Sequence, residues 1–411
     1  MIARTMTWAI AALLFCGGCT NFGGAPLWGD EDAAPRFPTG GGGKVGRGDR
    51  EQGPGEIGPG DSVSPAGDST PVVPGNLTVE FLGVQGFVLR RGADAILTAP
   101  LFSNPSLDQI IFGESGADPA RIDRALTGVD LSDVRAILVG HAHYDHLMDV
   151  PYIWSRTAQA YIYGNMSMRN ILSGFAPDAP ALCDVPVDPL VPVVPRDRLI
   201  ALNDPREDRV DSRNCAGAST CEGGLPGDAG VWVHVPNSRA RIMALCSAHP
   251  AQFLWVHFGE GCVEEEMCQP PTGAADWLEG TTLAYIVDFL DAAGAPEFRI
   301  YYQDAPTDGP VGHVPEDILA QRSIDLAILC TGTYDRVADH PGELLAHLQP
   351  RFVLAGHWED FFRPQDEPLR PIPFLDLDEF EQRLTDAMPQ GSGAPRWARP
   401  EPGMTYTLEA R

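Results

Sequence analysis

The sequence predicts an α/β protein. Short apolar runs rich in β-branched residues alternate with stretches compatible with helices, which is typical of α/β architectures. In four cases a metal-ligating side chain follows the run closely, and the carboxyl ends of strands are where α/β folds collect functional groups. We expect one continuous folded domain over residues 77–411, with strands at residues 135–139, 241–246, 282–287, 298–302, 324–330 and 352–355.

The chain begins with a short apolar segment after Arg4. Residues 8–16 are too short for the ~30 Å hydrocarbon layer of a membrane, which needs about 20 residues, so residues 1–19 are typical of a signal peptide. Gly17 and Gly18 precede Cys19 in an arrangement that resembles a bacterial lipobox, although Cys16 stands where leucine is usual. We expect export, with Cys19 acylated and the protein held in the cell envelope. The alternative is cleavage nearby and release into the periplasm or the medium.

A linker follows the export signal. Residues 20–76 are dominated by Gly, Pro, Asp and Ser, with too few large apolar side chains to offset the entropy of ordering them. This composition predicts a flexible tether between the anchored cysteine and the folded domain.

The charge of the chain restricts its partners. It carries 56 acidic and 29 basic side chains, for a formal net charge of -27. This charge repels phosphate backbones, so we expect no nucleic acid as partner. It also argues against tight docking to anionic lipids, so we expect membrane contact only through the lipid anchor on Cys19. The oligomeric state stays open.

Seven cysteines follow Cys19, and an oxidising compartment allows disulfides among them. A disulfide that closes a short loop is geometrically easy between Cys215 and Cys221 and between Cys262 and Cys268, because both pairs lie in loop-like stretches. Cys246 and Cys330 lie inside apolar runs and are predicted to be buried thiols. No C-x-x-C pair supports a zinc ribbon. The pairing stays open among Cys183, Cys215, Cys221, Cys262 and Cys268.

The folded part opens with a predicted antiparallel hairpin. Residues 77–89 are β-rich, residues 90–94 are typical of a turn, and residues 95–98 resume the strand pattern.

A dense group of metal-ligating residues follows the strand predicted at residues 135–139. It consists of His141, His143, Asp145 and His146, too rich in imidazole for a core. Three imidazoles leave one position of a tetrahedral Zn²⁺ open for water, whose pKa then falls to about 7.

Three later strands supply further candidates: His249, Asp304 and His357. His234 and His257 are alternatives to His249, but neither follows a strand and two small residues as His249 does. The Asp304 carboxylate is suited to bridge two metals about 3.5–4 Å apart.

This ordered pattern, H-x-H-x-D-H followed by a His, an Asp and a final His, resembles the metallo-β-lactamase fold superfamily over residues 77–370. The resemblance implies a four-layer αββα sandwich. It implies that His141, His143 and His249 hold a first metal, and that a second is held by Asp145, His146 and His357. Asp304 would bridge the two ions, and Asp145 and Asp304 would be the catalytic residues.

Finer details resemble the branch that contains ascorbate-6-phosphate lactonase-like hydrolases and N-acyl-phosphatidylethanolamine phospholipase D. The likeness lies in residues 96–103, residues 356–361 and the pair Glu367-Pro368. Three positions depart from that branch: Ala99 replaces an Asp, Val84-Gln85 replace a His and its neighbour, and Gln303 replaces a Gly. The predicted metal ligands are all present, so the departures concern the residues around them.

The resemblance implies hydrolysis, with a metal-bridging hydroxide attacking a carbonyl or phosphorus centre. The implied cofactors are two divalent metal ions, with Zn²⁺ as the default and Mn²⁺ or iron compatible with the same ligands. A small-molecule or lipid substrate is expected: a phosphodiester, a phospholipid or a lactone. His313 is a weak candidate for the acid that protonates the leaving group. The alternative function is a non-catalytic, metal-containing surface binding protein on the same fold.

Overall fold

A computed structural model describes residues 64–66, 75–112, 116–186, 188–203, 229–252, 257–388 and 396–411. The predicted signal segment, the anchor at Cys19, most of the linker, Cys215 and Cys221 lie outside these residues. The described residues all belong to one compact unit, Pro54–Arg411.

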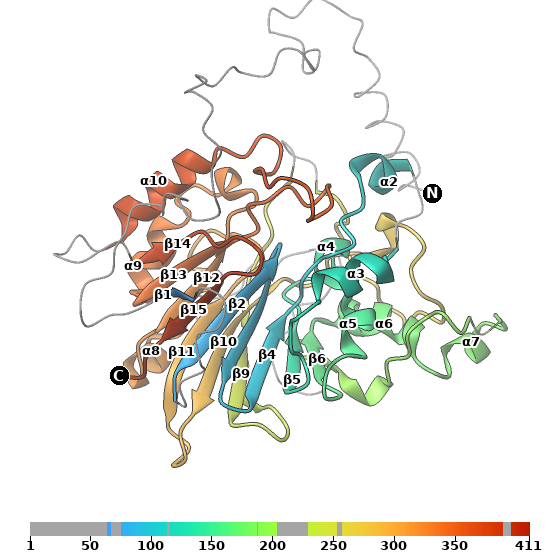
Figure 1. The fold of residues 1–411 in the computed structure, drawn as a ribbon, viewed down its shortest axis with the longest axis horizontal. Helices are drawn as coiled ribbons and strands as arrows, with labels where there is room; N and C mark the ends of the chain where they lie inside the picture. The colour runs from blue at the N-terminus through green and yellow to red at the C-terminus, as the bar shows by residue number, and fades with distance from the viewer. Residues whose placement is uncertain are drawn as a thin grey trace, which may run out of the picture. The chain divides into compact units, whose positions relative to one another are not determined.

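The first of two sheets contains eight strands in the order β1-β15-β2-β3-β4-β5-β6-β7 (Figure 1). In this order, the neighbouring strands β1, β15, β2, β3 and β4 pair antiparallel. The neighbours from β4 to β7 pair parallel. The predicted hairpin is confirmed and extended, because β2 also pairs with β3. The bounds are β1 Ser64–Ala66, β2 Leu77–Gly83, β3 Gly86–Arg91, β4 Asp94–Thr98, β5 Val134–Leu138, β6 Tyr161–Gly164, β7 Leu199–Ala201 and β15 Thr405–Leu408.

The second sheet contains seven strands in the order β14-β13-β12-β11-β10-β9-β8. Strands β8 to β11 pair antiparallel, and β11 to β14 pair parallel. Each strand predicted for this half is confirmed, whereas the two-residue strands at the edges were not predicted. The bounds are β8 Val233–His234, β9 Ala240–Cys246, β10 Leu283–Leu290, β11 Pro296–Tyr302, β12 Leu326–Cys330, β13 Phe352–Gly356 and β14 Trp397–Ala398.

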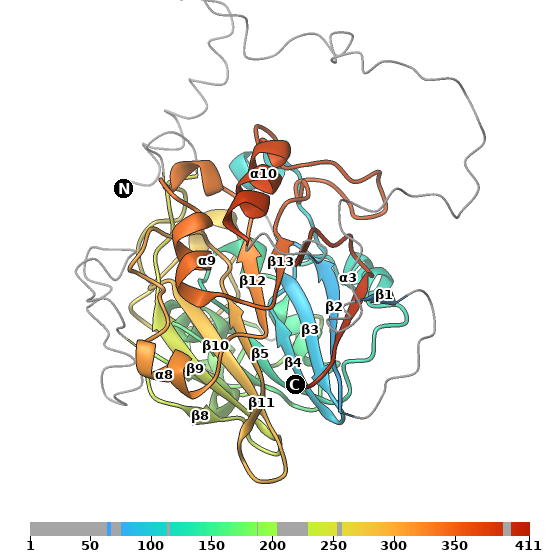
Figure 2. The ribbon, with the colours of Figure 1, turned by 90° about the vertical axis from the view of Figure 1, so that its left-hand side faces the viewer.

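Helices cover the outer faces of the two sheets (Figures 1 and 2). Beside the first sheet lie α3 Pro119–Ala125, α4 Tyr144–Leu147, α5 Val150–Trp154, α6 Met166–Leu172 and α7 Ala179–Leu182, and α2 Leu107–Phe112 lies at one end of the sandwich. Beside the second lie α8 Glu316–Gln321, α9 Gly342–Leu348 and α10 Leu377–Ala387. Short 3₁₀ turns occur at Ser173–Phe175, Arg196–Arg198, Ala274–Asp276 and Tyr334–Arg336. None of the helices described here is long and apolar enough to span a membrane.

Three apolar layers hold the sandwich together. Alternate residues of β2, such as Val79 and Phe81, meet alternate residues of β10, such as Tyr285 and Val287, between the sheets. The opposite faces of the sheets pack against their own helices. Central strands are therefore buried on both faces, which explains their continuous apolar sequence. The predicted four-layer αββα fold is confirmed.

Strand β1 lies within the segment predicted to be a linker. Ser64–Ala66 pairs antiparallel with β15, opposite Thr405 to Thr407. Such a short strand has no sequence signal of its own, because its partner supplies the hydrogen bonds from more than three hundred residues away along the chain.

The sequence left the disulfide pairing open, and the structure pairs Cys268 with Cys183 at a Cα–Cα distance of 5.8 Å, not with the nearby Cys262. Cys246 is buried as predicted, yet it is disulfide-bonded and not a thiol. Cys330 is a buried free thiol, as predicted. Disulfide formation depends on the distance between Cα atoms in the fold, and proximity in sequence does not determine that distance.

Candidate metal centre

The first motif occupies the turn between β5 and α4. His143 has extended backbone torsions (φ -63°, ψ 155°) directly before α4, so the chain turns there and α4 carries Asp145 and His146 inward. Gly140 precedes the motif, and a side chain on it would collide with the carboxylate of Asp304. The sequence around the motif therefore allows a strand end, a carboxylate and a helix start to approach closely.

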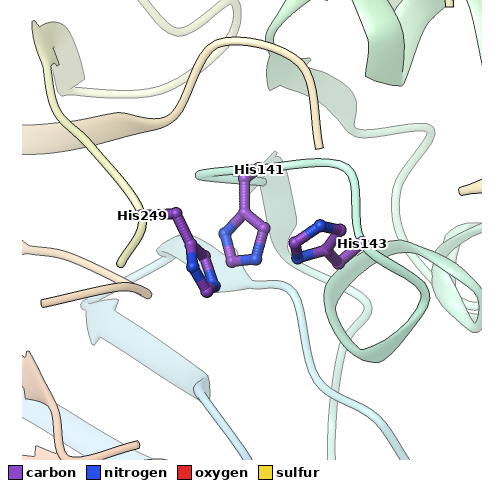
Figure 3. A group of neighbouring side chains, drawn as sticks. All are labelled: His141, His143 and His249. Atoms are coloured by element: carbon purple, nitrogen blue, oxygen red, sulfur yellow. The ribbon is translucent and has the colours of Figure 1, made fainter. Parts of the chain in front are cut away.

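The first predicted metal group is assembled in the structure. One ligand atom from each of His141, His143 and His249 lies within 4.8 Å of the others. Figure 3 shows the three rings converging on one point. The Nδ1 atom of His249 lies 2.7 Å from the carbonyl oxygen of Pro250. Because a carbonyl only accepts, Nδ1 carries the proton and the lone pair of His249 is on Nε2.

The second predicted group lies beside the first. The Oδ2 atom of Asp145 is 3.4 Å from His146 Nε2 and 3.3 Å from His357 Nε2. The metal-ligand group that the described residues form here is His141, Asp145 and His146, with ligand atoms within 4.8 Å of one another, and His357 is not a member of it. His357 has a left-handed backbone (φ 55°), which is costly for a residue with a side chain and is held by its N–H donating to the Val84 carbonyl.

Asp304 lies at the end of β11, between the two groups. Its Oδ2 accepts a hydrogen bond from the Gly140 N–H at 2.8 Å, and its Oδ1 is 3.0 Å from His141 Nδ1. Oδ2 is also 3.9 Å from His146 Nδ1. The position suits a bridging carboxylate, and the bridging role itself stays a prediction.

Unpartnered nitrogens test whether these residues fit metal ions. The atoms His141 Nε2, His143 Nε2, His146 Nδ1 and His357 Nδ1 are buried and have no hydrogen-bond partner. Buried polar atoms are normally paired, so unpaired nitrogens on four neighbouring histidines indicate a ligand-binding site. Imidazole and carboxylate donors suit Zn²⁺, Mn²⁺ or iron. The residues present therefore fit divalent cations.

Burial also sets the protonation states. It lowers the pKa of His141 to about 4 and the pKa values of His143 and His146 to about 3, so all three are neutral at pH 7. Burial acts to raise the pKa of Asp145, but His146 and His357 outweigh it and hold that pKa well below its usual value. Neutral imidazoles and an ionised carboxylate are the forms that bind metal.

Some of the residues that depart from the predicted branch make hydrogen bonds next to the candidate centre. Gln85 Nε2 donates to the carbonyl of Gln303 at 2.6 Å, and Glu359 accepts from the Val84 N–H. Burial raises the pKa of Glu359. A side chain on Gly356 would collide with Gln85. Two of the three departures, Val84-Gln85 and Gln303, are thus linked by a hydrogen bond, and Val84 also accepts one from the His357 N–H.

Two residues near the centre were not predicted as ligands. His257, set aside in favour of His249, lies next to it, and Glu279 completes a group whose ligand atoms are within 4.8 Å of one another. The signal for Glu279 in the sequence is a carboxylate followed by glycine just before the apolar strand β10. His313 stacks on His347 at 4.3 Å and belongs to none of the metal-ligand groups formed by the described residues. His234 is exposed on β8.

The comparisons with known proteins agree with this fold. Residues 83–202 match the family model described as the Metallo-beta-lactamase superfamily. That segment contains the whole H-x-H-x-D-H motif, so the predicted resemblance is confirmed at the level of the superfamily. The particular branch of that superfamily stays a prediction. No curated protein matches the chain.

Solved structures with similar folds share little sequence with this chain. The metallo-beta-lactamase fold protein YhfI from Bacillus subtilis is 11% identical, with 80% of this chain and 98% of that chain covered and a TM-score of 0.40. A metallo hydrolase from the hyperthermophilic archaeon Ignicoccus hospitalis is 16% identical, with 82% and 100% covered and a TM-score of 0.39. A diphosphatase from the PhnP family is 11% identical, with 82% and 98% covered and a TM-score of 0.35.

Proposed function

We propose that the protein is a dinuclear metallohydrolase, tethered to the cell envelope, that acts on a phosphodiester, a phospholipid or a lactone. The observation that carries the proposal is the pair of adjacent buried ligand groups with four unpartnered nitrogens. A folding role does not account for so many unpaired donors and acceptors in one place.

Each group has a defined part in the proposal. His141, His143 and His249 hold the first ion, and a second ion is held by Asp145, His146 and His357, with Asp304 between them. Bound cations of this kind lower the pKa of water and stabilise negative charge on the substrate. Zn²⁺ is the default ion, with Mn²⁺ or iron as alternatives.

The chain's own groups prepare the reaction. Asp145 is ionised, because its pKa is held well below the usual value, so it can accept a hydrogen bond from the attacking water and orient it. The Gly140 N–H and His141 hold the Asp304 carboxylate in place. Preorganised groups of this kind need no rearrangement during the reaction.

The membrane anchor favours a substrate at or near a lipid surface. The proposed acylation of Cys19 and the linker would keep the domain close to the membrane without burying any of it. The net charge of -27 argues against tight binding to anionic lipid and against nucleic acid.

The test is release of the head group from phosphatidylethanolamine and from N-acylated phosphatidylethanolamine by the mature chain. Asp304→Ala should reduce head-group release by more than the roughly 10–100-fold that is typical when a residue hydrogen-bonded to a metal ligand is replaced. Circular dichroism should show an unchanged fold. Metal content is measured for both proteins. Equal activity in the variant would exclude the proposed centre.

If a folded, metal-loaded wild type releases no head group, lactones and small phosphodiesters become the leading candidate substrates. No metal-dependent hydrolysis in that wider panel would favour the metal-containing binding protein instead.

A further inference from the structure

A third cluster of ligating atoms adjoins the first metal group. His249, His257 and Glu279 each offer an atom within 4.8 Å of the others. Glu279 is completely buried just before β10, whereas His257 is only partly buried. The cluster therefore extends from the buried centre toward a more exposed loop.

Unpaired atoms point into this cluster as well. Glu279 Oε1 accepts from the Thr282 hydroxyl at 2.7 Å, but Oε2 is buried without a partner, and so is Nε2 of His257. An unpaired carboxylate oxygen in the interior is costly.

The first metal group and the third cluster share one ligand atom, the Nε2 of His249. His249 donates its Nδ1–H to Pro250, so only Nε2 can ligate, and one nitrogen lone pair binds one cation at a time. The first group and the third cluster therefore cannot both use His249 at the same moment. They are alternative positions for a cation, with His143 Nε2 3.9 Å from Glu279 Oε2 at their boundary.

We propose that His249, His257 and Glu279 form an auxiliary site for a divalent transition metal ion, from which the ion is transferred to the first group. Two imidazoles and one carboxylate are a common ligand set for zinc, with an open position left for water. The partly buried His257 receives the ion from the solvent side, and transfer is complete when His249 turns its lone pair to the ion held by His141 and His143.

The test uses Co²⁺ as the probe on the full chain stripped of metal. His143→Gln removes a ligand of the first group that belongs to neither other group. This variant should retain an ion in the auxiliary site, so adding Glu279→Gln should lower the bound Co²⁺ by about one ion per chain. Bound metal is measured after gel filtration, and circular dichroism confirms the fold.

Glu260→Gln is the matched control, because it removes the same charge from an exposed side chain near the cluster. His143→Gln with Glu260→Gln should bind as much Co²⁺ as His143→Gln alone. Equal Co²⁺ content with and without Glu279 would overturn the auxiliary site. The readout is metal content, so a wild type that binds metal without hydrolysing any substrate would refute the proposed function and leave this inference standing.

Discussion

Two of the buried polar clusters formed by the described residues are built in opposite ways. In the second sheet, Asp288 and Arg299 are both fully buried, and Asp288 accepts two hydrogen bonds from Arg299 at 2.7 and 2.8 Å. Arg241 donates to the same carboxylate, and Arg299 also donates to the carbonyls of Ile318 and Arg322. Every charge in this network has a partner.

The candidate metal centre leaves several of its imidazole nitrogens unpaired. Its histidine rings pack at centroid distances of 4.4 to 5.1 Å, yet four of their nitrogens lack partners. Pairing lets the sheet bury these charges without leaving any of them unsatisfied, whereas the unpaired nitrogens cost stability and remain able to bind a ligand.

Breaking the paired network should have the largest effect on stability. Arg299→Met leaves part of the Asp288 charge without its partner and two carbonyls without a donor, so the free energy of unfolding should fall by about 3–5 kcal/mol. Denaturant unfolding of the wild type and the variant measures this loss of free energy. Arg124→Met is the control, because the Arg124–Asp366 pair is 62% and 56% exposed and should contribute less than about 1 kcal/mol. Equal losses in the two variants would contradict the comparison.

Acid should weaken the protein through a buried histidine outside both clusters. Burial, aided by the charge of Arg383, lowers the pKa of His340 to about 3. Between the unfolded value of about 6.5 and this value, the unfolded chain binds one more proton. Stability should therefore fall as the pH decreases through this window, by up to about 1.4 kcal/mol per pH unit from His340 alone.

His340→Leu should reduce that pH slope, as measured by denaturant unfolding at several pH values in metal-free protein. The exposed His234 on β8 provides the control, and His234→Leu should keep the slope of the wild type. An unchanged slope in His340→Leu would show that His340 is not neutral and buried in solution.

Removing a histidine from the candidate metal centre should have the smallest effect on stability. His146 is 1% exposed, with its Nδ1 unpartnered and its Nε2 3.4 Å from Asp145 Oδ2. In metal-free protein, His146→Leu removes an unsatisfied nitrogen but also a neighbour of the Asp145 carboxylate, so the free energy of unfolding should change by less than about 1 kcal/mol. The same variant should lose bound metal. A loss of stability as large as that of Arg299→Met would contradict the contrast between the two clusters.

Local sequence was sufficient for the first half of the centre. His141, His143, Asp145 and His146 lie within six residues after one buried strand, so the turn into α4 brings them together whatever the rest of the fold does. The central strands were equally predictable, because burial on both faces leaves a continuous apolar run. The glycine before the motif is explained only by Asp304, which approaches it from another strand.

The sequence by itself thus determined the α/β class, the central strands and the predicted ligands that are neighbours along the chain. The tertiary structure alone decided that β1 pairs with β15, that Cys183 bonds with Cys268, and that Glu279 and His257 adjoin His249. The physical reason is that hydrophobic periodicity and local backbone geometry act over a few residues. Contacts between distant segments depend on the order and register in which the strands pair.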